Sequence, residues 1–258
     1  MEYIIRKLSH EETEVIASVS QLLNTSYDRD VSEYFIYRDN GYIPYLTKSL
    51  AENRDSIYVV VNSADNALIG FAQVKPVLSS IFLNNIIILP EFRGHNIASK
   101  LLSYIIKNFD NGLNNIQTFS LDVFERNSSV LNWYQRLGMK VSGVKYWYDL
   151  FDIYNSGKPG QTFRGKETGN ISVREDESGF EQVFTDQVQI GTLIANNTML
   201  MRSVPSIEII SQLKEYFGTR LKAMCLITEK EFDYPLIDRS LKLEIRIEDL
   251  EGNLDKLN

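Results

Sequence analysis

A continuous apolar run that stops at a proline and then passes into a helical pattern constrains this chain most. Residues 86–89 read Ile-Ile-Ile-Leu, which is typical of a central strand covered on both faces. After Pro90 the period changes, because apolar side chains recur at spacings of three and four from Ile97 to Phe109. This spacing predicts one buried face of a helix, and the Asn-Gly pair at 111–112 predicts its end.

The turn between this strand and this helix suits an anion. Residues 93–98 read Arg-Gly-His-Asn-Ile-Ala, so small and polar residues let the backbone approach a ligand closely. The first N–H groups of a helix have no partner within the helix, and such amides bind phosphate. The residues that would form this site are Arg93, Gly94, His95, Asn96, Ile97, Ala98 and Ser99.

The turn resembles the diphosphate-binding pattern of the GNAT superfamily of acetyl-CoA-dependent N-acetyltransferases. That pattern is Arg or Gln, two residues, Gly, one residue, then Gly or Ala; Arg93 and Ala98 fit it. Asn96 stands at the first pattern glycine, and Asn tolerates left-handed conformations better than other non-glycine residues. The resemblance implies that acetyl-CoA is the acyl donor. It also implies that the strand binds the pantetheine arm through backbone groups near Ile86 and offers an N–H near Ile88 to the thioester oxygen.

The flanking segments keep the order of that family. Residues 57–61 and 68–74 predict a hairpin before the cofactor strand, and residues 119–123 predict a strand after the helix. Asn127 then opens a helical pattern that contains Tyr134 and ends at Gly138. The resemblance extends over about residues 1–152.

We therefore expect a mixed α/β (α+β) fold with two domains. Residues 1–152 would form a GNAT-like central, mostly antiparallel sheet with flanking helices and a splayed cofactor strand. Residues 153–162 lack periodicity and predict a linker, and residues 163–258 predict a small α+β domain without a recognisable family. Residues 164–169, Arg-Gly-Lys-Glu-Thr-Gly, imitate the cofactor turn, which raises the alternative of a tandem acetyltransferase with a degenerate second copy. No apolar strand precedes them and a strand-like segment follows, so we interpret them as a polar connector.

Acetyl transfer to an amine needs a proton acceptor for the amine and a proton donor for the departing thiolate. The family order makes Tyr134 the candidate acid, because a phenol stays protonated at neutral pH. The alternative is that Tyr134 only packs on the sheet. Asn127 would bind the pantetheine arm, or cap the helix that follows it.

The general base has no clear candidate in the sequence. Many family members carry a Glu on or beside the cofactor strand, where this chain has Asn84 and Asn85. Either amide could hold a water molecule that passes a proton to solvent. Asp122 on the neighbouring strand is equally readable as a base and as a structural carboxylate, so the base stays unassigned.

The acceptor site is expected in a segment rich in tyrosine, and Asn84, Asn85 and Asp122 are further candidates to bind the acceptor. Residues 27–46 combine aromatic side chains, Tyr27 and Tyr34 among them, with carboxylates that would suit a cation. The same residues could cover a sheet instead. The two readings have equal weight in the sequence.

Composition excludes several other classes of protein. The formal net charge of −7 argues against broad nucleic-acid binding. No apolar run approaches the roughly 20 residues of a membrane span, and no secretory segment opens the chain, so we expect a cytoplasmic protein. Cys225 is set in an apolar run and reads as core, and one Cys with two His makes a metal site improbable.

The sequence thus predicts an acyltransferase that moves an acetyl group to a primary amine of a small molecule or protein, by direct attack in a ternary complex. The C-terminal domain would shape the acceptor cleft or form a homodimer contact. One alternative is a non-catalytic acyl-CoA-binding or interaction module with a degenerate fold. Another is an enzyme that carries succinyl or longer acyl groups.

Overall fold

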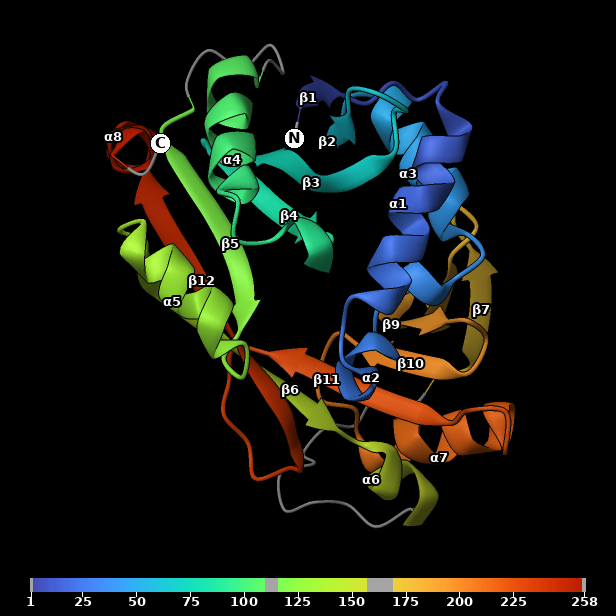
Figure 1. Cartoon of the computed structure of the whole chain (residues 1–258). Helices are drawn as coiled ribbons and strands as arrows, with labels where there is room; N and C mark the ends of the chain where they lie inside the picture. Colours follow the sequence, from blue (N-terminus) through green and yellow to red (C-terminus); the bar gives the residue numbers. More distant parts are fainter. Residues whose placement is uncertain (1, 110–115, 157–168, 257–258) are drawn as a thin grey trace. The chain divides into compact units, whose positions relative to one another are not determined.

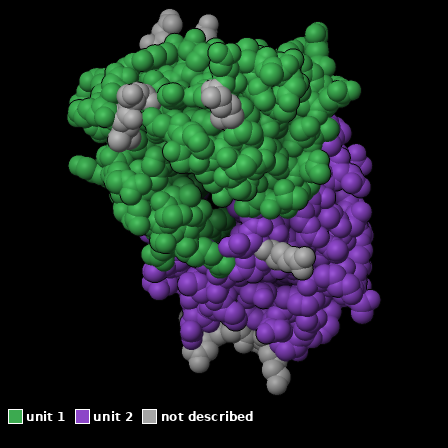
Figure 2. All heavy atoms as spheres, viewed as in Figure 1, with its two compact units in different colours: residues 1–26, 46–143, 241–258 green, residues 27–45, 144–240 purple. Residues whose placement is uncertain are grey.

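The computed structural model describes residues 2–109, 116–156 and 169–256. Its contacts divide the chain into two compact units (Figure 2). Unit 1 comprises residues 1–26, 46–143 and 241–258, and unit 2 comprises residues 27–45 and 144–240. Each unit combines strands with covering helices, as the sequence predicts.

Unit 1 contains the predicted strand, turn and helix. Its strands are β1 (Tyr3–Lys7), β2 (Ser56–Asn62), β3 (Leu68–Val77), β4 (Ser80–Ile88) and β5 (Thr118–Phe124), with parts of β6 (Lys140–Asp149) and β12 (Leu236–Arg246). Its helices are α1 (Thr13–Thr25), α3 (Tyr42–Ala51, from Leu46 onward), η2 (Pro90–Phe92), α4 (Ile97–Asn108), α5 (Ser128–Arg136) and α8 (Ile247–Asp255).

The sheet of unit 1 runs in the order β1-β2-β3-β4-β5-β12. Neighbours from β1 to β4 are antiparallel, and β4 is parallel to β5 because α4 connects them. Helix α4 contacts β2 and β4, whereas α1 contacts β3, and α8 packs on α4 (Figure 1). Leu101, Leu121 and Leu254 are fully buried in the core between α4, α8 and the sheet.

Strands β4 and β5 separate part-way along their length. They pair only from Ser80–Leu83 to Thr118–Leu121, although both strands continue further. The separation follows a β-bulge, because Val74 lies opposite Leu83 and Gln73 lies opposite Asn85, which leaves Asn84 as the extra residue. We call residues 84–88 of β4 the splay segment. Its edge on the β5 side is the splayed cofactor strand that the sequence predicts.

Unit 2 is built in the same way from different residues. Its strands are β7 (Ile171–Glu175), β8 (Glu181–Thr185), β9 (Val188–Ile194), β10 (Thr198–Met201) and β11 (Ala223–Thr228), with the remaining parts of β6 and β12. Its helices are α2 (Arg29–Ser32), η1 (Ile36–Arg38), α6 (Phe151–Ser156) and α7 (Ile207–Phe217). Strands β7 to β10 are antiparallel neighbours, β10 is parallel to β11 across α7, and β11 pairs with β6.

The strand and helix order of unit 2 therefore repeats that of unit 1. Strands β7 to β11 with α7 follow the order of β1 to β5 with α4, and each unit ends on one further strand. A glycine marks equivalent positions, because Gly70 pairs with Ile88 at the end of β4 and Gly191 pairs with Met201 at the end of β10. A Cβ at either glycine would lie within 2.7 Å of a carbonyl oxygen of the neighbouring strand. Only glycine fits that approach without a shift of the backbone.

The predicted elements are confirmed, but two segments group differently from the predicted domains. Residues 241–258 pack within unit 1, where Asn253 Nδ2 donates to the carbonyl of Leu137 at 3.1 Å. Residues 27–45 pack within unit 2, where the backbone N–H of Ala195 donates to Asp39 at 2.8 Å. That residues 1–152 and 163–258 fold as separate domains stays a prediction. The contacts of residues 27–45 and 241–258 do not favour it.

Some predictions fall partly or wholly outside the described residues. Helix α4 ends at Asn108, before the expected end at 111–112. Residues 111–112 lie outside the described residues, as do residues 157–162 of the linker and most of the connector at 164–169. Residues 153–156, expected as linker, continue helix α6. Among the helices of the described segments, none combines the length and apolar character that a bilayer span requires.

Candidate active site

The N-terminus of α4 opens into a cavity of unit 1. The cavity measures about 600 Å³, and the turn before α4, the start of α4 and one face of α5 line it. We call it the α4 pocket; its lining residues are Ile88, Phe92, Arg93, Gly94, Asn96, Ile97, Ala98, Ser99, Ser129, Val130, Trp133 and Arg136. The structure thus brings together most of the residues predicted to bind the cofactor.

The conformation of the turn leaves backbone amides of α4 directed at this pocket. Asn96 adopts the left-handed conformation at φ 59° and ψ 17°, and no side chain caps the helix. The backbone N–H of Lys100 donates to the Asn96 carbonyl at 3.2 Å, so the amides of residues 97–99 precede the first helical bond. Gly94 has φ 80°, a conformation that favours glycine. Asn96 meets the backbone demand of the pattern glycine that it replaces.

Two guanidinium groups add positive charge to the α4 pocket. Arg93 Nε donates to the carbonyl of Ile88 at 2.9 Å, which holds the side chain against the end of β4. In the described part of the chain, its two terminal nitrogens have no partner, and neither has the guanidinium of Arg136. A helix N-terminus with two available guanidinium groups is suited to an anion such as a diphosphate.

The splay segment continues from this pocket along β4. Ile86 and Ile88 pair with Ala72 and Gly70 of β3 on one side, and β5 leaves the other side unpaired. Backbone groups on an unpaired strand edge accept an extended chain as an additional strand partner. An anion pocket beside such an edge fits a ligand with a diphosphate and an amide-containing arm.

Comparison with known proteins agrees with this geometry. Residues 16–139 match the model of the acetyltransferase (GNAT) family. Residues 16–139 form a GNAT acetyltransferase domain. No protein of curated function is similar enough in sequence to match the chain.

Solved structures extend the fold comparison to the whole chain. A tandem GNAT protein from the clavulanic acid biosynthesis pathway aligns over 95% of this chain and 99% of its own, with a TM-score of 0.65 and 11% identity. PaiA N-acetyltransferase from Thermoplasma acidophilum, in complex with coenzyme A, covers 55% of this chain and 92% of its own, with a TM-score of 0.44 and 25% identity. Spermidine N-acetyltransferase from Vibrio cholerae, in complex with CoA and spermine, covers 96% and 97%, with a TM-score of 0.45 and 13% identity. The first of these shares the fold of both units, repeat included.

The second repeat lacks the features that make the α4 pocket. In the GNAT domain the splay segment is unpaired toward β5, but the whole of β10 pairs with Ala223–Leu226 of β11. Residues 202–206 lead into α7 without a glycine and with Pro205, and the Ser206 side chain already accepts from the N–H of Ile209 at 3.2 Å. The strand edge that the GNAT domain leaves open is therefore paired in unit 2, and one of the amides at the start of the helix is capped.

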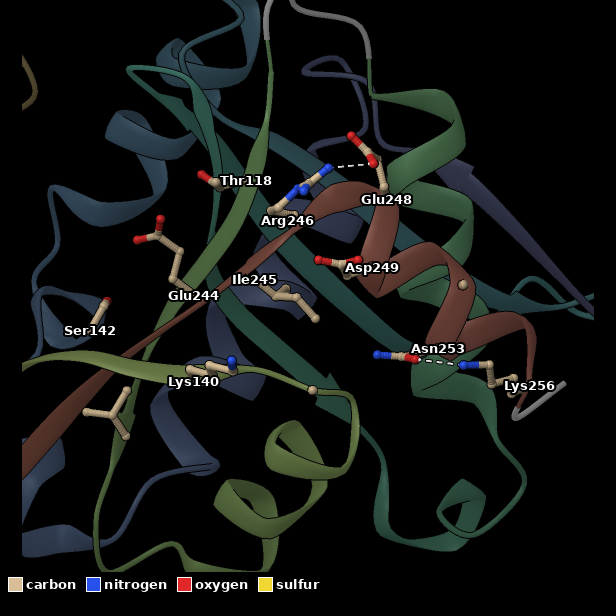
Figure 3. Close-up of a pocket in the computed structure, with 13 residues that line it drawn as sticks. Thr118, Lys140, Ser142, Glu244, Ile245, Arg246, Glu248, Asp249, Asn253 and Lys256 are labelled. Carbon is tan, nitrogen blue, oxygen red and sulfur yellow. Dashed lines mark hydrogen bonds and ion pairs between the residues drawn. The ribbon is translucent and has the colours of Figure 1, made fainter.

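A larger cavity in the same unit has a different character. It measures about 660 Å³ and lies between β5, β6, β12 and α8 (Figure 3). Two of its three cations already have partners, because Arg246 pairs with Glu248 at 2.6 Å and Lys256 donates to the amide of Asn253 at 3.2 Å. Glu248 and Asp249 occupy the first turn of α8, where carboxylates oppose the binding of an anion. Size alone favours this cavity for an acyl donor, but its charges do not.

Tyr134 of the GNAT domain packs in the core. It is 4% exposed and belongs to the core cluster that contains Leu121 and Leu137, and its ring lies tilted against that of Trp133 of the α4 pocket with a centroid distance of 4.8 Å. Its hydroxyl makes no hydrogen bond to any described residue. Burial raises the pKa of Tyr134 above its ordinary value, so the phenol keeps its proton throughout the neutral range. Packing is thus part of its role, and its function as the acid stays a prediction.

His95 and Asn127 do not line the α4 pocket. The Nδ1 of His95 donates to the carbonyl of Arg93 at 3.0 Å, so the imidazole stabilises the turn from its exposed side. Asn127 is the N-cap residue of α5, and its side chain accepts from the hydroxyl of Ser129 at 3.4 Å. Direct binding of the acyl donor by either residue stays a prediction.

The two asparagines of β4 belong to a buried polar cluster. Asn84 donates to Asp55 at 3.2 Å, and Asn85 donates to Gln73 at 2.9 Å. Asp122 alternates with Leu121 and Val123, which face α4, so its carboxylate is on the opposite face of the sheet. Its role as a base stays a prediction. Asp55 was not identified from the sequence, although a lone acidic residue directly before a buried strand was a signal for it.

Tyr27 and Tyr34 belong to unit 2, whereas the asparagines of β4 belong to unit 1. Tyr34 is 4% exposed and packs against Cys225, and burial beside the charges of Asp149 and Glu33 raises its pKa. The ring of Tyr27 meets that of Phe35 edge-on, with a centroid distance of 4.7 Å. These contacts favour the packing interpretation, and a contribution to acceptor binding stays a prediction.

Trp133 and Arg136 of the α4 pocket were also not identified from the sequence. Both lie on the face of α5 that begins at Val130, at helical spacings of three. That spacing was the available signal. No group of three or more His, Cys, Asp or Glu side chains converges on a possible metal position within the described segments.

Proposed function

We propose that the chain is an N-acetyltransferase that moves an acetyl group from acetyl-CoA to a primary amine. The observation that carries this proposal is the α4 pocket: an uncapped helix N-terminus with two available arginines that opens onto the unpaired splay segment. The family of residues 16–139 supports acyl transfer. The acetyl group and the amine are the finer parts of the proposal.

The residues have separate roles in this reaction. The amides of residues 97–99 and Arg93 bind the diphosphate of the acyl donor, while backbone groups of Ile86 and Ile88 bind its arm. The neutral amine attacks the thioester carbonyl in a ternary complex, and a carbon–nitrogen bond replaces the carbon–sulfur bond. The amine loses one proton to solvent, and Tyr134 supplies a proton to the departing thiolate and regains one from solvent. Backbone N–H groups of the splay segment are the candidates to stabilise the oxyanion.

One acyl-donor site per chain follows from the contrast between the two repeats. The pairing of β10 with β11 and the capped start of α7 support a role for unit 2 other than binding acyl-CoA. We infer that unit 2 shapes the acceptor side or an assembly contact.

Release of free thiol from acetyl-CoA tests the proposal directly. The purified chain is mixed with acetyl-CoA, alone and with n-butylamine, spermidine or lysine ethyl ester, and thiol release is compared with that of Ala98→Glu. We expect amine-dependent release that the variant lacks, because its carboxylate would stand against the diphosphate. Succinyl-CoA as a second donor tests the acyl group. Acyl-CoA binding without turnover would instead support a non-catalytic acyl-CoA-binding module.

A further inference from the structure

A buried carboxylate supports the β-bulge of β4. Asp55, which directly precedes β2, is 2% exposed, and its side chain accepts from three neutral donors. Gln73 Nε2 and Asn84 Nδ2 each donate to Asp55 Oδ1 at 3.2 Å, and the hydroxyl of Ser49 in α3 donates to Oδ2. Asn85 extends the cluster by donating to Gln73 Oε1 at 2.9 Å.

The carboxylate determines which way the amide of Asn84 points. An ionised carboxylate only accepts hydrogen bonds, so the amide must turn its NH₂ group toward Asp55. The rotated amide would place Asn84 Oδ1 against Asp55 Oδ1, which brings two acceptors together. In the observed orientation nothing in the described part of the chain donates to Asn84 Oδ1, and the residue is half-buried.

This amide lies at the start of the splay segment. Asn84 is the extra residue of the bulge, and β4 and β5 stop pairing at the preceding Leu83. The α4 pocket begins at Ile88, at the other end of the segment. An acyl donor with its diphosphate in that pocket and its arm along β4 therefore extends its thioester toward Asn84, and not to the N–H of Ile88 where the family resemblance placed it.

The amide also lies on the face of the sheet opposite α4. Gln73 is placed between Ala72 and Val74, which belong to the core under α4, so its side chain points to the other face. Asn84 bonds the same carboxylate as Gln73 and shares that face. An acceptor that approaches from there meets the thioester from the side away from the helix that holds the diphosphate.

We propose that Asn84 is the residue that binds the acceptor amine, and that Asp55 is the positioning residue that directs its carbonyl oxygen to the amine. A neutral primary amine has two N–H bonds and one lone pair. One N–H donates to Asn84 Oδ1 while the lone pair remains directed at the thioester carbon. The inference rests on the proposed function and names the residue that recognises its substrate class.

Asp55 is not the base in this arrangement. Its carboxylate is buried and accepts from Ser49, Gln73 and Asn84, so the amine cannot reach it without displacing a donor. Asp55 acts only through Asn84. The effects of substituting Asp55 and Asn84 on kcat/KM should therefore not be additive.

The test compares single and double variants in steady-state kinetics. Asn84→Leu keeps the branched shape of the side chain but removes its carbonyl oxygen. Asp55→Asn keeps the shape of Asp55 but removes the negative charge and one of the two oxygens that hold the donors Ser49, Gln73 and Asn84. We expect each to lower kcat/KM for the amine roughly 3- to 10-fold, the loss of one hydrogen bond. The affinity for acetyl-CoA should not change, and Asn24→Leu, on the exposed surface of α1, should behave as wild type.

The double variant separates positioning from general stability. If Asp55 acts through Asn84, adding Asp55→Asn to Asn84→Leu lowers kcat/KM no further, even though it lowers the melting temperature. Independent losses that multiply would overturn the role of Asp55. The acceptor probes are n-butylamine, spermidine and lysine ethyl ester.

Two other outcomes overturn the inference and differ from failure of the proposed function. If Asn84→Leu retains full kcat/KM with the amine, Asn84 does not bind the acceptor, whether or not Asp55→Asn folds. If the wild-type chain binds acetyl-CoA but turns over none of the three primary amines, the acceptor class is wrong. Failure to bind acetyl-CoA at all would instead contradict the proposed function.

Discussion

Leu254→Ala tests whether the C-terminal segment, residues 241–258, packs as part of unit 1. Leu254 of α8 is fully buried in the cluster that also contains Leu101 of α4 and Leu243 of β12. The substitution removes three carbon atoms, which at roughly 0.8 kcal/mol for each buried methylene costs about 2.4 kcal/mol. The unfilled cavity adds to this, so we expect a loss of about 2–5 kcal/mol in the free energy of unfolding of unit 1.

The two tryptophans allow each unit to be followed separately. Trp133 packs against the core of unit 1, and Trp147 lies in unit 2. In a Trp147→Phe background, fluorescence during urea unfolding reports on unit 1, and in a Trp133→Phe background it reports on unit 2. Leu78→Ala is the matched control, because Leu78 is 93% exposed and its truncation should change stability by less than about 0.5 kcal/mol.

The result distinguishes two domain assignments. If residues 241–258 belong to unit 1, Leu254→Ala shifts the transition that Trp133 reports. A shift confined to the Trp147 signal would instead place Leu254 in the packing of unit 2 and contradict this assignment. A loss no larger than that of Leu78→Ala would refute the packing argument altogether.

The site and the core can be tested at Tyr134, Arg93 and Cys225. Tyr134→Phe should lower kcat at saturating substrates while leaving the affinity for acetyl-CoA nearly unchanged, and full turnover by this variant would remove Tyr134 from the mechanism. Arg93→Gln should weaken acetyl-CoA binding about 10-fold and make the remaining binding less dependent on salt, whereas Arg174→Gln in β7 should alter neither. Burial raises the pKa of the Cys225 thiol above that of an unfolded thiol, which is about 8.5. The buried neutral thiol therefore contributes fully to the free energy of unfolding below about pH 8.5, and this contribution is lost as the pH rises further. Between about pH 8.5 and 9.5, before tyrosines titrate, wild type should therefore lose stability more steeply than Cys225→Ala, and equal slopes in urea unfolding would contradict this.

Local sequence signals predicted the cofactor half of the site. One short segment contains the apolar run of β4, the turn with Arg93 and the helical spacing of α4. The structure that these patterns predict therefore does not depend on contacts with distant segments. The left-handed conformation of Asn96 was also predictable, because side-chain chemistry restricts which residues adopt it.

The acceptor half depends on contacts between distant segments. Asp55 and Asn84 are far apart in sequence and meet only because β2, β3 and β4 pair in one register with a bulge. Strand patterning predicts that a strand exists but not which strand it joins, so the sequence did not show that β12 joins β5. The repeat was also not visible in the sequence, because residues 202–206, which precede α7, carry no cofactor pattern. Gly191, the counterpart of Gly70, is the one equivalent glycine that we find among the described residues.

The proposed function requires that acetyl-CoA binds once per chain, at the N-terminus of α4. Isothermal titration with acetyl-CoA measures both the affinity and the number of sites, with Ala98→Glu in the α4 pocket and Ala64→Glu on an exposed turn as a matched pair. We expect one site per chain in the wild type and in Ala64→Glu, and no binding in Ala98→Glu. Unchanged binding by Ala98→Glu, or two sites per chain, would contradict it.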